Sequence, residues 1–257
     1  MDFLNAIILI SNFIIVPAIT YGSQLALGAI GVTLIYGVLR FANFAYGDLM
    51  AFGTMVVILF TWYLQSKGIS FGLLPTAILA LPIGIVFTIA ISLFFDKTVF
   101  EYYREKKSNP VTFIVVSLGI MFVLNAIVRI IIGPNDINFM DGHKFIMKAR
   151  EFKQLTGLNE GLAIKSTQVI TLITTIITCS LLFYFLNKTK TGKSMRAYSD
   201  NEDLALLSGI DPKKIILLTR IIVSILATVA GTLYGLDKSF KPFTYFNNLL
   251  PIFAATI

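Results

Sequence analysis

The chain has 257 residues, of which 56% are hydrophobic and only 14% are charged, and its mean hydropathy is +0.81. Soluble domains carry nearer a quarter of charged residues, so this composition indicates a membrane protein. The net charge of +7 comes from basic residues between apolar runs, which is typical of membrane surfaces and excludes a soluble nucleic-acid-binding domain. The single cysteine, Cys179, excludes a disulfide framework and a cysteine metal cluster.

Seven apolar runs approach or exceed the length needed to span about 30 Å of hydrocarbon as a helix. The N-terminus lacks a basic region and a cleavage site, so the first run is interpreted as a retained span. We therefore predict an all-α, polytopic transmembrane helix bundle that forms one domain over residues 1–257. The predicted segments are 3–19, 25–39, 49–64, 71–95, 111–132, 169–186 and 215–236, and an eighth run begins at Leu249.

Basic residues concentrate in two predicted loops, at 96–109 and 187–214. Both loops fall on one side if every segment crosses once, and the positive-inside rule makes that side cytoplasmic. This count predicts a cytoplasmic N-terminus and an external loop at about 133–166. If segment 25–39 is re-entrant and does not cross, the parity of every later segment changes.

The loop at about 187–214 contains the pattern of a short, capped helix. Asp200 is a candidate N-cap, and Gly209 is placed to end the helix in a left-handed conformation. Asp211 and Pro212 then begin another helix as its cap and first residue. The apolar positions form a small surface that suits docking on another protein, although a helix lying on lipid headgroups fits the same pattern. These positions are Leu204, Ala205, Leu207 and Ile210.

No catalytic or metal-binding cluster is predicted. Residues 191–194, TGKS, resemble the end of a phosphate-binding loop, but the motif's first glycine is replaced by Asn187 and an apolar segment precedes it where a strand is required. His143 is the only histidine and has no cysteine nearby, so it indicates neither a metal site nor a catalytic triad.

A polar break separates the second and third predicted segments, between Arg40 and Asp48. Asn43 and Asp48 are able to satisfy open backbone groups there, with Asp48 as the cap of the next helix and Gly47 beside it. Non-helical backbone at membrane depth occurs where it is buried or lines a watery cavity, so Asn43, Gly47 and Asp48 are candidates for a translocation path. An ordinary cytoplasmic turn with a helix cap explains these residues equally well.

Small residues recur at four-residue spacing in the last predicted segment, at Ala227, Gly231 and Gly235. Such spacing lets another helix approach closely, so it predicts a packed bundle rather than an isolated anchor.

Two stretches carry a specific pattern: residues 28–49, GAIGVTLIYGVLRFANFAYGDL, and the loop with TGKSMRA at 191–197 and LSGI at 207–210. Both resemble the branched-chain amino acid ABC transporter permeases of the LivH type, which usually have histidine in place of Tyr46. The resemblance extends from about Leu25 to Gly235. It implies that the loop docks on ATP-binding subunits. The residues expected to carry this coupling are Arg196, Ala197, Asp203, Ala205, Leu207, Gly209 and Ile210.

The resemblance also implies the kind of subunit, its location and its partners. The expected protein is a permease subunit in the plasma (inner) membrane of a bacterium, without a cofactor of its own because partner subunits use the ATP. The expected partners are a second permease of the LivM type, two ATP-binding subunits, an external substrate-binding protein and membrane lipid. Family members continue past Ile257 with a glycine-rich segment and further helices, which this chain is expected to lack.

Two other function classes are compatible with a polytopic chain. An ion- or proton-coupled secondary transporter of small solutes should place acidic residues in the middle of its spans, and segments three to seven contain none well inside. A membrane-embedded enzyme should contain a polar catalytic cluster at membrane depth, and no such cluster is visible.

Overall fold

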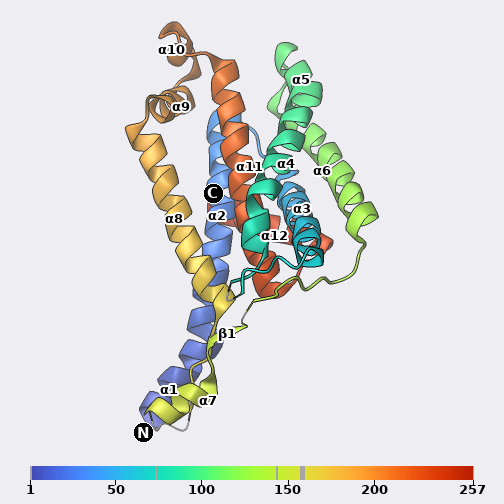
Figure 1. The fold of residues 1–257 in the computed structure, drawn as a ribbon. Coiled ribbons are helices and arrows are strands. Elements are labelled where there is room, and N and C mark those ends of the chain that lie inside the picture. The colour runs from blue at the N-terminus through green and yellow to red at the C-terminus, as the bar shows by residue number, and fades with distance from the viewer. Residues whose placement is uncertain (1, 73, 143, 157–159, 257) are drawn as a thin grey trace.

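The computed structural model describes residues 2–72, 74–142, 144–156 and 160–256, which form a bundle of long helices (Figure 1). This confirms the predicted all-α class, because the strands are one short antiparallel pair between α6 and α8. The elements are α1 (Asp2–Ile10), the π-helical turn η1 (Ser11–Ile15), α2 (Val16–Leu39), α3 (Tyr46–Ser66), α4 (Ala77–Phe95), the π-helical turn η2 (Asp96–Phe100), α5 (Glu101–Glu105), α6 (Pro110–Ile132), β1 (Phe145–Met147), α7 (Ala149–Thr156), β2 (Ile164–Lys165), α8 (Ser166–Lys188), α9 (Lys190–Asp200), α10 (Glu202–Leu207), α11 (Pro212–Lys238) and α12 (Pro242–Thr256).

Within the described ranges, six helical segments are long and apolar enough to cross a membrane. The prediction of seven is wrong because the first two segments form one continuous helix, Phe3–Leu39. At 37 residues this helix is about 55 Å long, well beyond the thickness of the hydrocarbon. Its N-terminal part extends past the rest of the bundle (Figure 1). There the polar side chains of Asn5 and Asn12 accept hydrogen bonds from the backbone N–H groups of Glu160 and Ala163.

The N-terminus and the loop of α9 and α10 lie at opposite ends of the bundle (Figure 1). The two helices that flank this loop, α8 and α11, run in opposite directions between the same two ends. The prediction that the N-terminus shares a side with the basic loops is therefore wrong, since it required seven crossings. The predicted loop 96–109 is also mostly helical, because α4 continues through η2 and α5 to Glu105.

Helix α11 is the central element and packs against α2, α3 and α4. Its small residues allow this close approach: Ala227 is fully buried, and a Cβ atom on Gly231 would lie 2.6 Å from Thr54 Oγ1 and 2.7 Å from the carbonyl oxygen of Met50 on α3. A Cβ atom on Gly235 would lie 2.8 Å from the hydroxyl of Tyr245 on α12. Side chains larger than hydrogen at these glycines would separate the helices.

Helix α12 follows α11 and packs back against α2 and α3. The hydroxyl of Tyr245 donates a hydrogen bond to the carbonyl oxygen of Gly231 at 2.9 Å, which fixes α12 to α11. The eighth apolar run predicted from Leu249 is the second half of this helix, which begins earlier, at Pro242.

We predict that Gly231→Ala destabilises the folded protein and that Gly119→Ala does not. The added methyl group at Gly231 meets backbone and side-chain atoms, and such overpacking costs about 1–3 kcal/mol. Gly119, in α6, is a matched control because a Cβ atom there would have no neighbouring atom within 4 Å. Thermal unfolding of the two purified variants in the same detergent measures the difference, and equal midpoints would contradict the packing described for α11.

Candidate functional site

A sharp corner between α8 and α9 begins the polar loop. Thr189 caps α9, since its hydroxyl oxygen accepts a hydrogen bond from the N–H of Gly192 at 3.0 Å. A Cβ atom on Gly192 would lie 2.3 Å from the carbonyl oxygen of Phe185, so the corner requires glycine. The TGKS sequence is thus part of a helix-to-helix corner and has no strand before it, which agrees with its rejection as a phosphate-binding loop.

The short helix α10 is closed at both ends. Its N-cap is Asn201, whose side chain accepts a hydrogen bond from the N–H of Leu204 at 3.0 Å, so the prediction of Asp200 as the cap is wrong by one residue. Asp200 is instead the last residue of α9, a helix that the sequence did not predict. At the other end Gly209 has φ +79°, and the N–H groups of Gly209 and Ile210 bind the carbonyl oxygens of Leu206 and Ala205. This is the Schellman arrangement expected of a C-terminal glycine.

The apolar residues of α10 divide between two faces. Ala205 is buried and Ile210 half-buried in a small cluster with Met195 of α9 and Ile215 of α11. The leucines point away from this cluster. Leu204, Leu206 and Leu207 are 59%, 42% and 86% exposed, respectively. The inner face fixes α10 to its own chain, and the outer face, which we call the leucine patch, is free within the described residues.

The other residues predicted for coupling lie on the exposed surface near the leucine patch. Arg196 and Ala197 are exposed on α9, and Arg196 donates a hydrogen bond to Asn187 Oδ1 at 2.8 Å. Asp203 is exposed in the first turn of α10, where its negative charge complements the helix dipole. The hydroxyl of buried Tyr198 donates to Glu202 at 2.6 Å, and burial together with this carboxylate raises the pKa of Tyr198.

The loop contacts the polar break directly. The guanidinium of Arg40 donates a hydrogen bond to the carbonyl oxygen of Ser199 in α9. In return, the hydroxyl of Ser199 donates to the carbonyl oxygen of Gly37 at 3.0 Å. Arg40 adopts the left-handed conformation, with φ 59°, and ends α2. The two features that the sequence singled out separately are therefore neighbours.

The break is buried or half-buried, and the backbone N–H groups of Phe44, Ala45 and Tyr46 have hydrogen-bond partners. Asn43 Oδ1 accepts a hydrogen bond from the N–H of Ala45 at 3.1 Å, as expected of a residue that satisfies open backbone groups. The N–H of Phe44 donates to the hydroxyl of Ser117 on α6, and Phe41 stacks on Phe100 and Phe113. This arrangement is a packed, non-helical segment between helices.

Asp48 does not cap α3, in contrast to the prediction. It lies inside the helix, is 1% exposed, and accepts a hydrogen bond through Oδ1 from the amide of Asn125 on α6 at 2.7 Å. Its second oxygen, Oδ2, has no hydrogen-bond partner among the described residues. A buried carboxylate with one oxygen unpaired is costly, so residues of this kind inside membranes are usually functional.

The remaining residues of the break serve close packing. A Cβ atom on Gly47 would lie 2.8 Å from the carbonyl oxygen of Tyr245, so Gly47 allows α12 to pack closely against the start of α3. Tyr46 is fully buried, and its hydroxyl occupies the space that a Cβ atom on Gly31 of α2 would need.

Sequence reasoning missed an ionic cluster near the break. Asp96 of η2 binds Arg104 through two hydrogen bonds, of 2.9 and 2.7 Å, and its Oδ1 accepts a third from Nε of Arg220 at 3.0 Å. Arg220 lies in α11, is 3% exposed, and packs its guanidinium over the ring of Phe100. An arginine inside the last predicted segment was the available signal, because charges within spans are rare and mark functional or paired sites.

Comparison with known proteins places the chain in a family. Residues 14–257 match the family described as the branched-chain amino acid transport system / permease component. The chain belongs to the branched-chain amino acid transport permease family. It is 27% identical to the high-affinity branched-chain amino acid transport system permease protein LivH of Escherichia coli K12, over 84% of this chain and 68% of that protein. No solved structure matches the chain.

Two further relatives have the same kind of name. The probable branched-chain amino acid transport permease protein LivH of Methanocaldococcus jannaschii is 30% identical, over 96% of this chain and 73% of its own length. The permease protein BraD of Pseudomonas aeruginosa is 25% identical, over 87% and 70%. The permease described here is thus a multi-pass inner-membrane protein and a non-enzymatic membrane component of the ABC importer class, and a secondary transporter is not favoured.

The described ranges contain no group of three or more histidine, cysteine, aspartate or glutamate side chains placed to hold a metal ion. His143, for which the sequence analysis found no metal-binding neighbour, lies outside the described residues.

We predict that Asn125→Ala destabilises the permease by about 1.5–3 kcal/mol, because it leaves the buried carboxylate of Asp48 without its hydrogen-bond donor. Asn109→Ala is the matched control, since the exposed Asn109 precedes the same helix without making a side-chain cap. The exchanged pair Asp48→Asn with Asn125→Asp should recover most of the loss. Thermal unfolding measures all four proteins, and equal stability of the two alanine variants would contradict the contact.

Proposed function

We propose that this permease imports a branched-chain amino acid or a related small amino acid or amide, driven by ATP hydrolysis in two partner subunits. A second permease of the LivM type and an external substrate-binding protein complete the proposed assembly. The names of the relatives supply the substrate class. The feature of this chain that carries the proposal is the leucine patch, presented on a doubly capped helix between two membrane spans.

The leucine patch suits docking on a protein better than lying on lipid. A helix on headgroups exposes apolar residues on one face and basic residues on the other. Here the first turn of α10 carries Glu202 and Asp203 next to the leucines, and anionic headgroups repel carboxylates. Buried contacts to α9 and α11 also hold α10 in place, so that an attached partner would move the whole corner.

The proposed orientation has α9 and α10 in the cytoplasm and the N-terminus outside. The cytoplasmic end then carries Arg40, Arg104 and the six basic residues of 187–214. The positive-inside rule favours this side for short basic loops. The loop between α6 and α8 then faces outward, as the sequence predicted for 133–166.

We assign Asn43 and Asp48 to the translocation path, with Gly47 allowing α12 to close against α3 beside them. Support comes from the non-helical backbone of the break and from the unpaired Oδ2 of Asp48. Asn43 and Arg220 also border a cavity of about 20 Å³, which has room for about one water molecule. This cavity is bordered by α3, α4, η2, α6 and α11, so we place the opening of the path between these elements.

The orientation predicts a labelling pattern for single cysteines introduced into a Cys179→Ser background. Lys67→Cys, after α3, should react with a membrane-impermeant thiol reagent added to intact cells. Lys193→Cys, in α9, should react only after the membrane is permeabilised. Both side chains are exposed, so access and not burial decides the result. The reverse pattern would overturn the orientation.

The docking role predicts that Leu207→Gln uncouples the transporter. The side chain is 86% exposed in this chain, so its replacement should leave folding intact while weakening attachment of the ATP-binding subunits. We expect at least about a tenfold loss of substrate-stimulated ATPase activity in the co-purified complex, equivalent to about 1.4 kcal/mol. The control is Lys193→Gln, which also introduces glutamine, but on α9. Unchanged assembly and stimulation in Leu207→Gln would contradict docking through this patch.

A further inference from the structure

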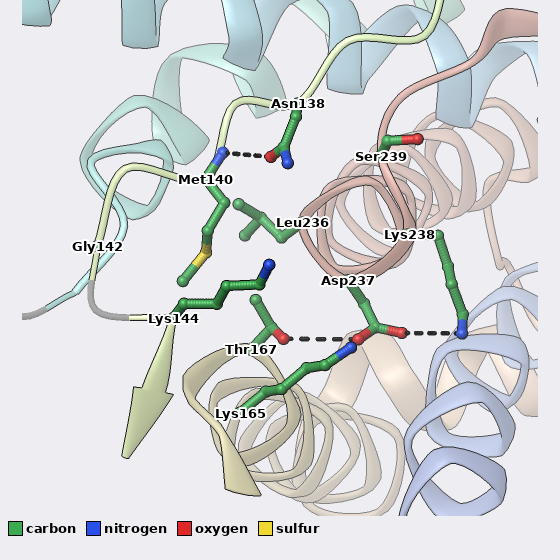
Figure 2. A pocket seen from close by; sticks show the side chains of 10 residues that line it. All are labelled: Asn138, Met140, Gly142, Lys144, Lys165, Thr167, Leu236, Asp237, Lys238 and Ser239. Atoms are coloured by element: carbon green, nitrogen blue, oxygen red, sulfur yellow. Dashed lines mark hydrogen bonds and ion pairs between the residues drawn. The ribbon is translucent and has the colours of Figure 1, made fainter. Parts of the chain in front are cut away.

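A cavity lies at the end of the bundle opposite α9 and α10. Its volume is about 230 Å³, below the range of about 300–1,000 Å³ that is typical of sites for drug-sized ligands. Three segments form its walls: the loop before β1, the start of α8 and the end of α11 (Figure 2). A ligand that fills it must be small, on the scale of a single amino acid.

Both signs of charge meet in this cavity. Lys144, Lys165 and Lys238 contribute ammonium groups, and Asp237 contributes a carboxylate. Figure 2 shows the side chains of Lys144 and Lys165 extending into the space between the loop before β1, α8 and α11. The cavity therefore offers donors for an anionic group and an acceptor for a cationic group within one small volume.

The side chain of Asp237 is buried but weakly paired. It is 6% exposed, and its partners among the described residues are the hydroxyl of Thr167 at 3.5 Å and Nζ of Lys238 at 3.7 Å. Both distances exceed those of strong hydrogen bonds to a carboxylate, which are about 2.7–2.9 Å. An ionised carboxylate has about four acceptor sites, so Asp237 retains capacity for an ammonium group of a ligand.

Apolar side chains cover another part of the wall. Leu236 is 6% exposed, and Met140 is half-buried across from it (Figure 2). The loop that carries Met140 is held to the turn before α4, because Asp141 accepts hydrogen bonds from Gln65 and from the N–H of Thr76, each at 2.8 Å. Burial alone would raise the pKa of Asp141, but these bonds hold that pKa below its usual value, so the anchor is ionised at neutral pH.

We propose that this cavity is an external binding site for a free α-amino acid with an aliphatic side chain. Lys144 and Lys165 bind the carboxylate, Asp237 binds the α-ammonium group, and Leu236 and Met140 contact the side chain. The site rests on the proposed function for its ligand class and adds a binding step on the permease itself. Asp237 lies in the last turn of α11, whose 27 residues span about 40 Å from Pro212, next to α10.

The test is direct binding of radiolabelled L-leucine to the assembled transporter in lipid nanodiscs without the external binding protein. Asp237→Asn and Lys165→Gln should each weaken leucine binding by about tenfold or more. Lys241→Gln is the control, because Lys241 lies just beyond α11 and its nearest ion-pair partner is Asp136, outside the cavity. Size-exclusion profiles identify any variant that fails to assemble. Lys165 is only half-buried, so its variant keeps the test valid if Asp237→Asn does not fold.

A leucine analogue tests which residues bind the carboxylate and which bind the ammonium group of the ligand. The carboxylate that lacks the amino group, 4-methylpentanoate, should compete more weakly than leucine, and Asp237→Asn should not weaken it further, whereas Lys165→Gln should. Wild-type leucine affinity in Asp237→Asn, or no leucine binding to the wild type, overturns the site. A bound anionic lipid that native mass spectrometry detects, that Lys165→Gln removes and that leucine does not displace also overturns it.

Uptake separates this inference from the proposed function. If the complete transporter takes up leucine and Asp237→Asn changes neither binding nor uptake, only the cavity site is wrong. If the wild-type transporter with its binding protein takes up no amino acid or amide, the proposed function itself fails.

Discussion

The close approach of α11 to α3 is the constraint on which the rest of the bundle depends. Within hydrocarbon there is no hydrophobic force between helices, so packing and internal hydrogen bonds must hold them together. Gly231 brings the two backbones close enough for contact, and its carbonyl oxygen then accepts the hydrogen bond from Tyr245. One small residue thus positions three helices, α3, α11 and α12, and with them the break that ends at Tyr46.

The ionic cluster extends this arrangement toward the polar loop. Arg220 of α11 forms an ion pair with Asp96 of η2. Arg104, which follows η2 in the chain, forms a second ion pair with the same carboxylate. Taking such charges from water costs several kcal/mol per ion, which only well-formed contacts offset. The three hydrogen bonds on Asp96 and the ring of Phe100 supply those contacts, and Phe100 in turn stacks on Phe41 of the break. The break, the cluster and α11 therefore form one connected structure.

Sequence reasoning recovered features that depend on local chemistry and missed those that depend on contacts between distant segments. The left-handed Gly209 and the Asp211 cap of α11 follow from neighbouring residues, and both are present. The continuous helix through residue 22 was missed because polar Thr20, Gln24 and the glycine between them look like a break. In the structure the hydroxyl of Thr20 donates a hydrogen bond to a carbonyl oxygen of the preceding turn. The side-chain amide of Gln24 donates one to the carbonyl oxygen of Leu233. The partner of Asp48 was missed for a similar reason, since Asn125 is 77 residues away.

The same connectivity joins α10, the break and the cavity through α11. At its start, Asp211 caps the helix directly after the Schellman turn of Gly209, so hydrogen bonds order the residues between α10 and α11. Along its length, α11 carries Arg220 beside the break and Gly231 against α3, and its last turn places Asp237 in the cavity. Packed interfaces of this kind shift between discrete arrangements and do not deform continuously. If α10 is displaced and α11 moves with it as a unit, the surroundings of Arg220, next to Asn43, and of Asp237 change together.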